Sequence, residues 1–150
     1  MNLNELILEI KKIFENKYDN ILSQLLDLIE EYEHTDWKDY VEWNEDKYNK
    51  KIVYQDDNFE IVIISWKIYQ ETRVHDHPEK GCVMRVLEGS LMETEYLNVA
   101  GIQKMSSNIL HKDDINWKRG KKLLHKICAL KNSISMHIYC PSKYVTKYYD

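Results

Sequence analysis

Apolar and polar positions in the first part of the chain follow the period of a helix. From Leu3, apolar side chains recur at steps of three and four with charged side chains between them, and the pattern restarts after residues 18–20. It predicts an amphipathic helix from Leu3, a second helix that ends near His34, and a short third helix over residues 35–43. Because these segments carry no chemical motif, we expect a helical cap, residues 1–45, packed on the outside of a sheet rather than a separate partner-binding unit.

Beyond residue 49 the apolar positions change to the pattern of β-strands. Short runs of β-branched and aromatic residues alternate with turn residues. The predicted strands cover residues 52–54, 59–66, 74–75, 82–87, 91–97, 109–111, 123–130 and 133–139. Many short strands in succession are typical of a small β-barrel. We therefore expect a mainly β protein, with residues 1–150 as a single domain and residues 46–150 as its barrel.

Length, charge and cysteine content limit the kinds of function that this chain can have. A length of 150 residues suits one domain with its own core. The net charge of −4, with acidic and basic residues interspersed, argues against a nucleic-acid partner. Three cysteines, an odd number without paired spacing, favour a reducing compartment over a disulfide framework. The chain contains neither a signal-like N-terminus nor a long apolar run, so we expect a soluble, cytoplasmic protein without a membrane partner.

The strongest chemical signal is a pair of histidines, His75 and His77, at the end of a predicted strand. Strand residues separated by two project from the same face, so both imidazoles can bind one metal ion. A later apolar strand supplies His125 as the best third ligand. We expect His34 and His111 to be ordinary surface or core histidines.

The segment that begins with this pair resembles the first metal motif of the cupin barrels. It has His-x-His, a turn with Pro78 and Gly81, and a strand that ends at Gly89. Cupins usually place a glutamate ligand where this chain has Cys82. The resemblance implies a cupin-type β-barrel, a jelly roll, with the N-terminal helices packed outside.

Within the cupins, the run HDHPEKGCVMRVLEGSLMETEY, residues 75–96, resembles the core motif of the cysteine dioxygenases, specifically their animal-type branch. Both the downstream run SMHIYCP, residues 135–141, and the segment of residues 31–53 also match this family, so the resemblance covers almost the whole chain. It implies three neutral histidine ligands, His75, His77 and His125, without a carboxylate. The chain departs from the family around His125, where Ala129 replaces an expected asparagine and the usual preceding proline and glycine are displaced, which leaves Gly120.

The resemblance implies an enzyme that adds both atoms of O2 to the sulfur of L-cysteine and forms cysteine sulfinic acid. Ferrous iron suits this chemistry because it accepts imidazole and thiolate ligands and reacts with oxygen, whereas zinc could not supply electrons. Ligand geometry alone leaves nickel and manganese open. The family also implies a monomer with a small-molecule thiol and O2 as its partners.

Family members of the animal type carry a thioether between a cysteine and a tyrosine. The matching residues here are Cys82 and Tyr139, although Cys82 can also be read as a small buried hydrophobic residue. The resemblance further implies a hydrogen-bonded relay of Ser135, His137 and Tyr139, in which His137 orients the tyrosine hydroxyl toward substrate and oxygen. Strand alternation places all three on one face.

The expected carboxylate clamp differs from that of the family. Lys50 stands where cysteine dioxygenases have an arginine, and Tyr48 matches a supporting tyrosine. Lysine keeps the charge but lacks the two-pronged geometry of arginine. Lys51 and Arg73 are alternative clamps. This difference leaves open a dioxygenase for another small thiol, such as 3-mercaptopropionate or cysteamine. A non-catalytic metal-binding cupin is a third reading, against which the His137–Tyr139 pair argues.

Overall fold

The structure, a computed structural model, describes residues 1–16 and 20–149. The predicted helices are confirmed as α1 (Leu3–Glu15), α2 (Ile21–Glu31) and the 3-10 helix η1 (Asp36–Tyr40). The Asn2 side chain caps α1 by accepting a hydrogen bond from the backbone N–H of Glu5. The break in the helical pattern predicted at residues 18–20 falls mostly outside the described residues.

Two helix boundaries differ from the prediction. Helix α2 ends at Glu31 rather than near His34, because Tyr32 adopts an extended backbone. The Tyr32 hydroxyl then donates a 2.5 Å hydrogen bond to Asp36 and fixes the turn into η1. η1 ends before Trp43, and its single tight turn buries Trp37.

The strands are β1 (Asn49–Gln55), β2 (Glu60–Trp66), β3 (Val74–His75), β4 (Gly81–Glu88), β5 (Ser90–Asn98), β6 (Ile102–His111), β7 (Ile115–Lys118), β8 (Leu123–Ala129), β9 (Ser133–Cys140) and β10 (Tyr148–Tyr149). The described chain is therefore mainly β, as predicted. The sequence pattern missed β7 and β10, and it predicted only the last three residues of β6. Strand β6 is exposed along most of its length and mostly polar, so it lacks the apolar alternation that marks a strand.

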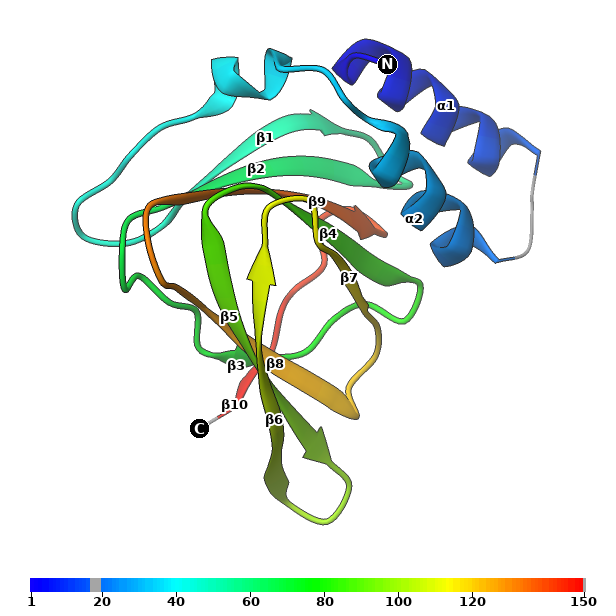
Figure 1. Cartoon of the computed structure of the whole chain (residues 1–150). Helices are drawn as coiled ribbons and strands as arrows, with labels where there is room; N and C mark the ends of the chain where they lie inside the picture. Colours follow the sequence, from blue (N-terminus) through cyan, green and yellow to red (C-terminus); the bar gives the residue numbers. More distant parts are fainter. Residues whose placement is uncertain (17–19, 150) are drawn as a thin grey trace.

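The described strands form two five-stranded antiparallel sheets (Figure 1). One has the order β1-β2-β9-β4-β7 and the other has the order β10-β3-β8-β5-β6. Apolar side chains of both sheets fill the space between them, among them Val62 and Ile64 of β2 and Ile127 of β8. Gly89 makes the tight turn between β4 and β5 with φ of +87°, and an added Cβ there would overlap the Ser133 side chain.

Helices α1 and α2 cover the outer face of the first sheet (Figure 1). Strand β2 is buried on both faces because Ile61 and Ile63 pack toward the helices while Val62 and Ile64 pack toward the barrel interior. Arg85 on β4 donates hydrogen bonds to carbonyl groups at the C-terminal end of α2 and forms an ion pair with Asp113. The helical cap is thereby fixed to the sheet on the side away from the barrel interior.

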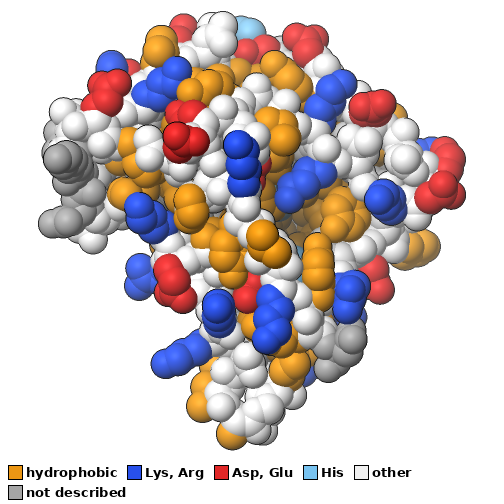
Figure 2. Space-filling view, turned by 180° about the vertical axis from the view of Figure 1, so that it is seen from behind, with side chains coloured by type: hydrophobic (Ala, Val, Ile, Leu, Met, Phe, Trp, Pro, Cys, Tyr) orange, Lys and Arg blue, Asp and Glu red, His pale blue; other side chains and the backbone are white. Residues whose placement is uncertain are grey.

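On the face drawn in Figure 2, basic side chains lie among acidic and apolar ones rather than in one continuous patch. None of the described helices is both long and apolar enough to span a membrane.

Candidate metal centre

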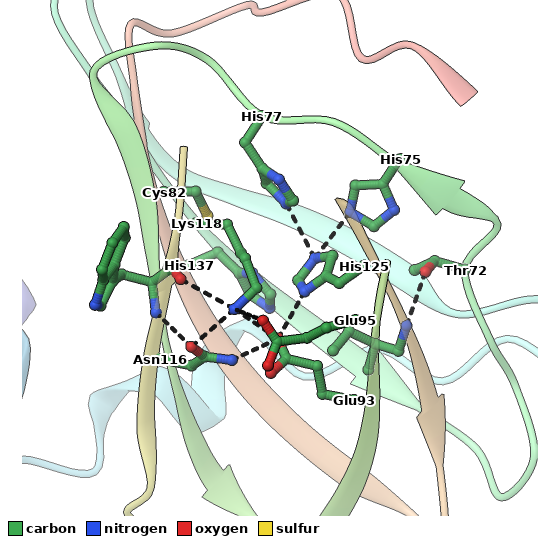
Figure 3. A network of polar contacts seen from close by, with 12 residues as sticks. Thr72, His75, His77, Cys82, Glu93, Glu95, Asn116, Lys118, His125 and His137 are labelled. Carbon is green, nitrogen blue, oxygen red and sulfur yellow. Dashed lines mark hydrogen bonds and ion pairs between the residues drawn. The ribbon is translucent and has the colours of Figure 1, made fainter. Parts of the chain in front are cut away.

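Three histidine rings meet at one end of the barrel interior (Figure 3). His75 ends β3 and lies directly opposite His125 of β8, and His77 follows two residues after His75. The His125 Nε2 atom lies 3.1 Å from Nε2 of His75 and 3.0 Å from Nε2 of His77. Within the described part of the chain, His75, His77 and His125 are the group that could hold a metal ion. The structure thus brings together the three residues that the sequence singled out.

The hydrogen-bond partners of the histidine rings explain why a cation would bind between the three Nε2 atoms. Nδ1 of His75 lies 2.7 Å from the Arg73 carbonyl oxygen, and Nδ1 of His125 lies 2.7 Å from a Glu93 carboxylate oxygen. Each Nδ1 faces an acceptor, so we assign the ring proton there, and each Nε2 then carries a lone pair. Two lone pairs that face each other at 3.1 Å repel, and a bound cation removes this repulsion.

The distances between the Nε2 atoms also match those expected around one metal ion. Three nitrogen atoms at about 2.1 Å from one ion and at right angles to each other would be about 3.0 Å apart. Nδ1 of His77 is buried without a hydrogen-bond partner among the described residues, so hydrogen bonding alone does not account for this cluster. Burial lowers the pKa of His75, His77 and His125, which favours the neutral rings that bind metals.

A pocket opens beside the three rings, and Cys82 and Tyr139 form part of its wall. The two residues are direct neighbours on the adjacent strands β4 and β9. Burial raises the pKa of the Cys82 thiol to about 12, and the positive charge of Lys50 opposes this only in part. Burial also raises the pKa of Tyr139, and the neighbouring Cys82 adds to that effect. Both groups are therefore neutral near pH 7 and lie within reach of each other.

A line of polar side chains leads from the barrel core to Tyr139. Trp66 Nε1 donates to Ser135 Oγ at 2.9 Å, and Ser135 Oγ lies 2.8 Å from His137 Nε2. His137 Nδ1 lies 3.5 Å from the Tyr139 hydroxyl, at the long limit of a hydrogen bond. Burial lowers the pKa of His137 to about 3. If Ser135 donates to the neutral His137 ring and the ring donates to Tyr139, the donors of Trp66, Ser135 and His137 are all used. The tyrosine proton is then free to point elsewhere.

Of the clamp candidates, Lys50 and Tyr48 line the pocket. The Lys50 ammonium lies 4.6 Å from the centre of the Tyr139 ring. Lys51, on the opposite face of β1, instead forms an ion pair with Glu42 at 3.5 Å. Arg73 stacks over the ring of Tyr148.

Neither Lys51 nor Arg73 is among the described residues that line the pocket, and the same holds for His34 and His111. Both of these histidines are exposed.

Two buried acidic residues near the metal centre were not found from the sequence. Glu93, in β5, has 2% of its surface exposed and contacts both His125 and Lys118. A single charged residue in a strand ordinarily indicates a solvent-facing position, so the pattern gave no signal for Glu93. Asp76 stands between the two ligand candidates in the sequence and is also buried.

Asp76 holds the segment that follows β9. It accepts hydrogen bonds from the Tyr144 hydroxyl at 3.0 Å, from the Lys147 backbone N–H at 2.9 Å and from the Tyr149 hydroxyl at 3.2 Å. Thr146, within this segment, lines the pocket. The short link between the two histidines therefore also fixes one wall of the site.

With this geometry in place, comparison with known proteins identifies the family. The sequence model of the family described as cysteine dioxygenase type I matches residues 1–150. The chain belongs to this family. Relatives named cysteine dioxygenase type 1 include the Danio rerio protein, 23% identical over 93% of this chain and 74% of its own length. The Homo sapiens protein is 25% identical over the same shares.

Solved structures agree on the fold of this cysteine dioxygenase family member. A Klebsiella pneumoniae protein described as having a double-stranded β-helix domain superposes with a TM-score of 0.59 at 20% identity, covering 80% of this chain and 99% of that one. An RmlC-like cupin from Desulfovibrio desulfuricans has a TM-score of 0.55 at 20% identity, covering 73% and 97%. The cupin fold expected from the histidine motif is thereby confirmed.

Proposed function

We propose that this protein is an iron-dependent thiol dioxygenase that converts L-cysteine and O2 to cysteine sulfinic acid. The main support is the cluster of His75, His77 and His125, whose Nε2 lone pairs converge beside the facing pair Cys82 and Tyr139. The reaction forms two sulfur–oxygen bonds and takes the thiol sulfur to the sulfinic level. Both oxygen atoms of O2 remain in the product.

Ferrous iron, held by the three histidines, would supply the redox chemistry that lets O2 react with a thiol. The protein's own part is to bind and orient the substrate. We assign Lys50 to the substrate carboxylate because its ammonium reaches the pocket wall over Tyr139. Tyr48, whose ring is tilted by 31° against that of Trp66 with ring centres 4.7 Å apart, would support that wall. Ser135 and His137 would hold the Tyr139 hydroxyl so that its proton faces the reacting groups.

We further propose that the 150 residues form one cupin domain that works in a reducing compartment such as the cytoplasm. Cys82, Cys128 and Cys140 are free thiols, which is the state expected there.

A thiol assay tests this proposal. Fe(II)-loaded protein is given O2 and, separately, L-cysteine, 3-mercaptopropionate or cysteamine, and the sulfinate products are measured. We expect L-cysteine to be preferred, because cysteamine lacks the carboxylate. Lys50→Ala should lower the efficiency with L-cysteine by about ten- to a hundred-fold, the usual effect of losing one charge-assisted hydrogen bond, and should leave cysteamine nearly unchanged. Lys50→Arg should keep or improve activity because arginine offers a two-pronged contact.

Lys51→Ala is the matched control, since Lys51 lies next in sequence but pairs with Glu42, and it should leave all rates unchanged. Equal rates for L-cysteine and cysteamine would remove Lys50 from the clamp role. A preference for 3-mercaptopropionate would change the substrate while keeping the reaction. Iron binding without any sulfinate would identify a non-catalytic cupin.

The cysteine–tyrosine thioether is a separate proposal, supported by the direct pairing of Cys82 with Tyr139 across β4 and β9. One carbon–sulfur bond forms, the thiol and the ring each lose one hydrogen, and O2, the oxidant, takes up both hydrogens to become hydrogen peroxide. Protein treated with iron, O2 and L-cysteine should lose the mass of two hydrogen atoms and migrate faster on a denaturing gel, because a long-range cross-link compacts the unfolded chain. Cys82→Ala should show neither change. If peptides containing Cys82 stay unlinked during turnover, this cysteine serves only for packing.

A further inference from the structure

Lys118 is a buried lysine close to the candidate metal centre. It ends the short strand β7 and has 5% of its surface exposed. Its Nζ atom lies 3.2 Å from a Glu93 carboxylate oxygen, 3.1 Å from the Asn116 side-chain oxygen and 3.1 Å from the Trp117 carbonyl oxygen. Lysine is almost never buried unless it is paired. These contacts use all three donors of the ammonium and fix it in place.

Glu93 connects this lysine to a ligand candidate (Figure 3). The same carboxylate oxygen, Oε2, that pairs with Lys118 also accepts the Nδ1 proton of His125 at 2.7 Å. The other ring nitrogen of His125 is the one that converges with His75 and His77. A continuous path of charge and hydrogen bonding therefore runs from Lys118 through Glu93 to the metal-facing atom of His125.

The charges along this path cancel. Glu93 contributes one negative charge, Lys118 contributes one positive charge, and the imidazole is neutral. Glu95 also lies 3.5 Å from Lys118, but its side chain is 22% exposed, so water screens its charge more strongly than that of Glu93. A carboxylate behind a ligating histidine makes the ring a stronger electron donor to a metal. A cation on that carboxylate works in the opposite direction.

We propose that Lys118 is a positioning residue that acts through Glu93. Its positive charge cancels that of the Glu93 carboxylate, so the three histidines together with Glu93 and Lys118 carry no net charge. This inference rests on the metal centre of the proposed function. Such a centre would leave the full charge of a divalent ion available to attract the substrate thiolate. Lys118 thereby weakens metal binding and strengthens the attraction between the bound ion and the substrate.

The proposal predicts that two single substitutions change metal affinity in opposite directions. Full-length protein is titrated with Co²⁺, and binding is followed by visible absorption. Glu93→Gln should weaken Co²⁺ binding by about ten- to a hundred-fold, because the ring loses its charged acceptor while Lys118 keeps its charge. Lys118→Met should strengthen binding by about tenfold, because one uncompensated negative charge then lies behind the ligand. Combining both substitutions should bring the affinity back toward that of the wild type.

Several variants separate this role from simple packing. Lys118→Arg keeps the charge and should bind Co²⁺ like the wild type, whereas Lys118→Gln, a second neutral variant, should bind more tightly. Exposed Lys122→Met is the control and should have no effect. The Co²⁺ absorption bands should shift in Lys118→Met and stay in place in Lys118→Arg, which a purely structural role would not produce.

The outcomes distinguish this inference from the proposed function. If both neutral Lys118 variants bind Co²⁺ more weakly than the wild type or equally well, the lysine is structural and the inference is wrong. If the wild-type protein binds neither Co²⁺ nor Fe²⁺, the metal centre itself fails, and the proposed function fails with it.

Discussion

Replacing His125 by alanine is expected to abolish iron binding and thiol oxidation together. The substitution removes the central member of the cluster, whose Nε2 contacts those of both His75 and His77. Two neutral imidazoles hold a ferrous ion only weakly, so the iron content should fall to background. Iron per chain and sulfinate formation are measured on the same purified sample, and a thermal melt reports whether the variant folds.

Alanine at His75 or at His77 should have the same effect, because each supplies one of the three converging nitrogen atoms. His111→Ala is the matched control, since that histidine is exposed at the end of β6 and should retain both iron and activity. Full iron and full activity in the His125 variant would disprove the third-ligand assignment, and His137 would then have to be tested as a ligand.

A steep loss of stability in mild acid is expected for the metal-free protein. Burial lowers the pKa of His137 to about 3, and it also lowers the pKa of His75, His77 and His125. In the unfolded chain each histidine has its ordinary pKa of about 6.5. Below that pH the unfolded state binds protons that the folded state does not, so stability present above about pH 6.5 is lost as the pH falls toward about 3.

His137 should lower the free energy of unfolding by about 1.4 kcal/mol per pH unit in this window, and the other three histidines, whose pKa is also lowered, should make the slope steeper. Urea denaturation of the metal-free protein at a series of pH values measures the slope. His137→Gln should reduce the slope by the contribution of one histidine. A constant free energy of unfolding between about pH 7 and about pH 5 would show that these rings take up protons without unfolding the protein.

Two groups of site residues that the sequence predicted share one property, which is regular local spacing. His75 and His77 stand two residues apart at the end of a strand, and Ser135, His137 and Tyr139 do so along β9. Strand alternation converts such spacing directly into side chains on one face. The same reasoning recovered α1 and α2, whose apolar residues follow the helical period.

The parts that were missed depend on contacts between distant segments. Glu93 and Lys118 are 25 positions apart in the sequence, and each alone looks like a solvent-facing charge. Strand β7, which carries Lys118, has only four residues, too few to display a period. The choice between Lys50 and Lys51 likewise required the register of β1 against β2, because alternation alone lets either one face inward.

The hydrogen bonds from Asp76 connect the segment after β9 to the link between two candidate metal ligands, His75 and His77. A shift of either histidine, such as the adjustment that binding of a metal ion would require, would therefore move the Asp76 carboxylate and the groups that donate to it. Through this one carboxylate, the occupancy of the metal centre would be transmitted to the pocket wall that includes Thr146.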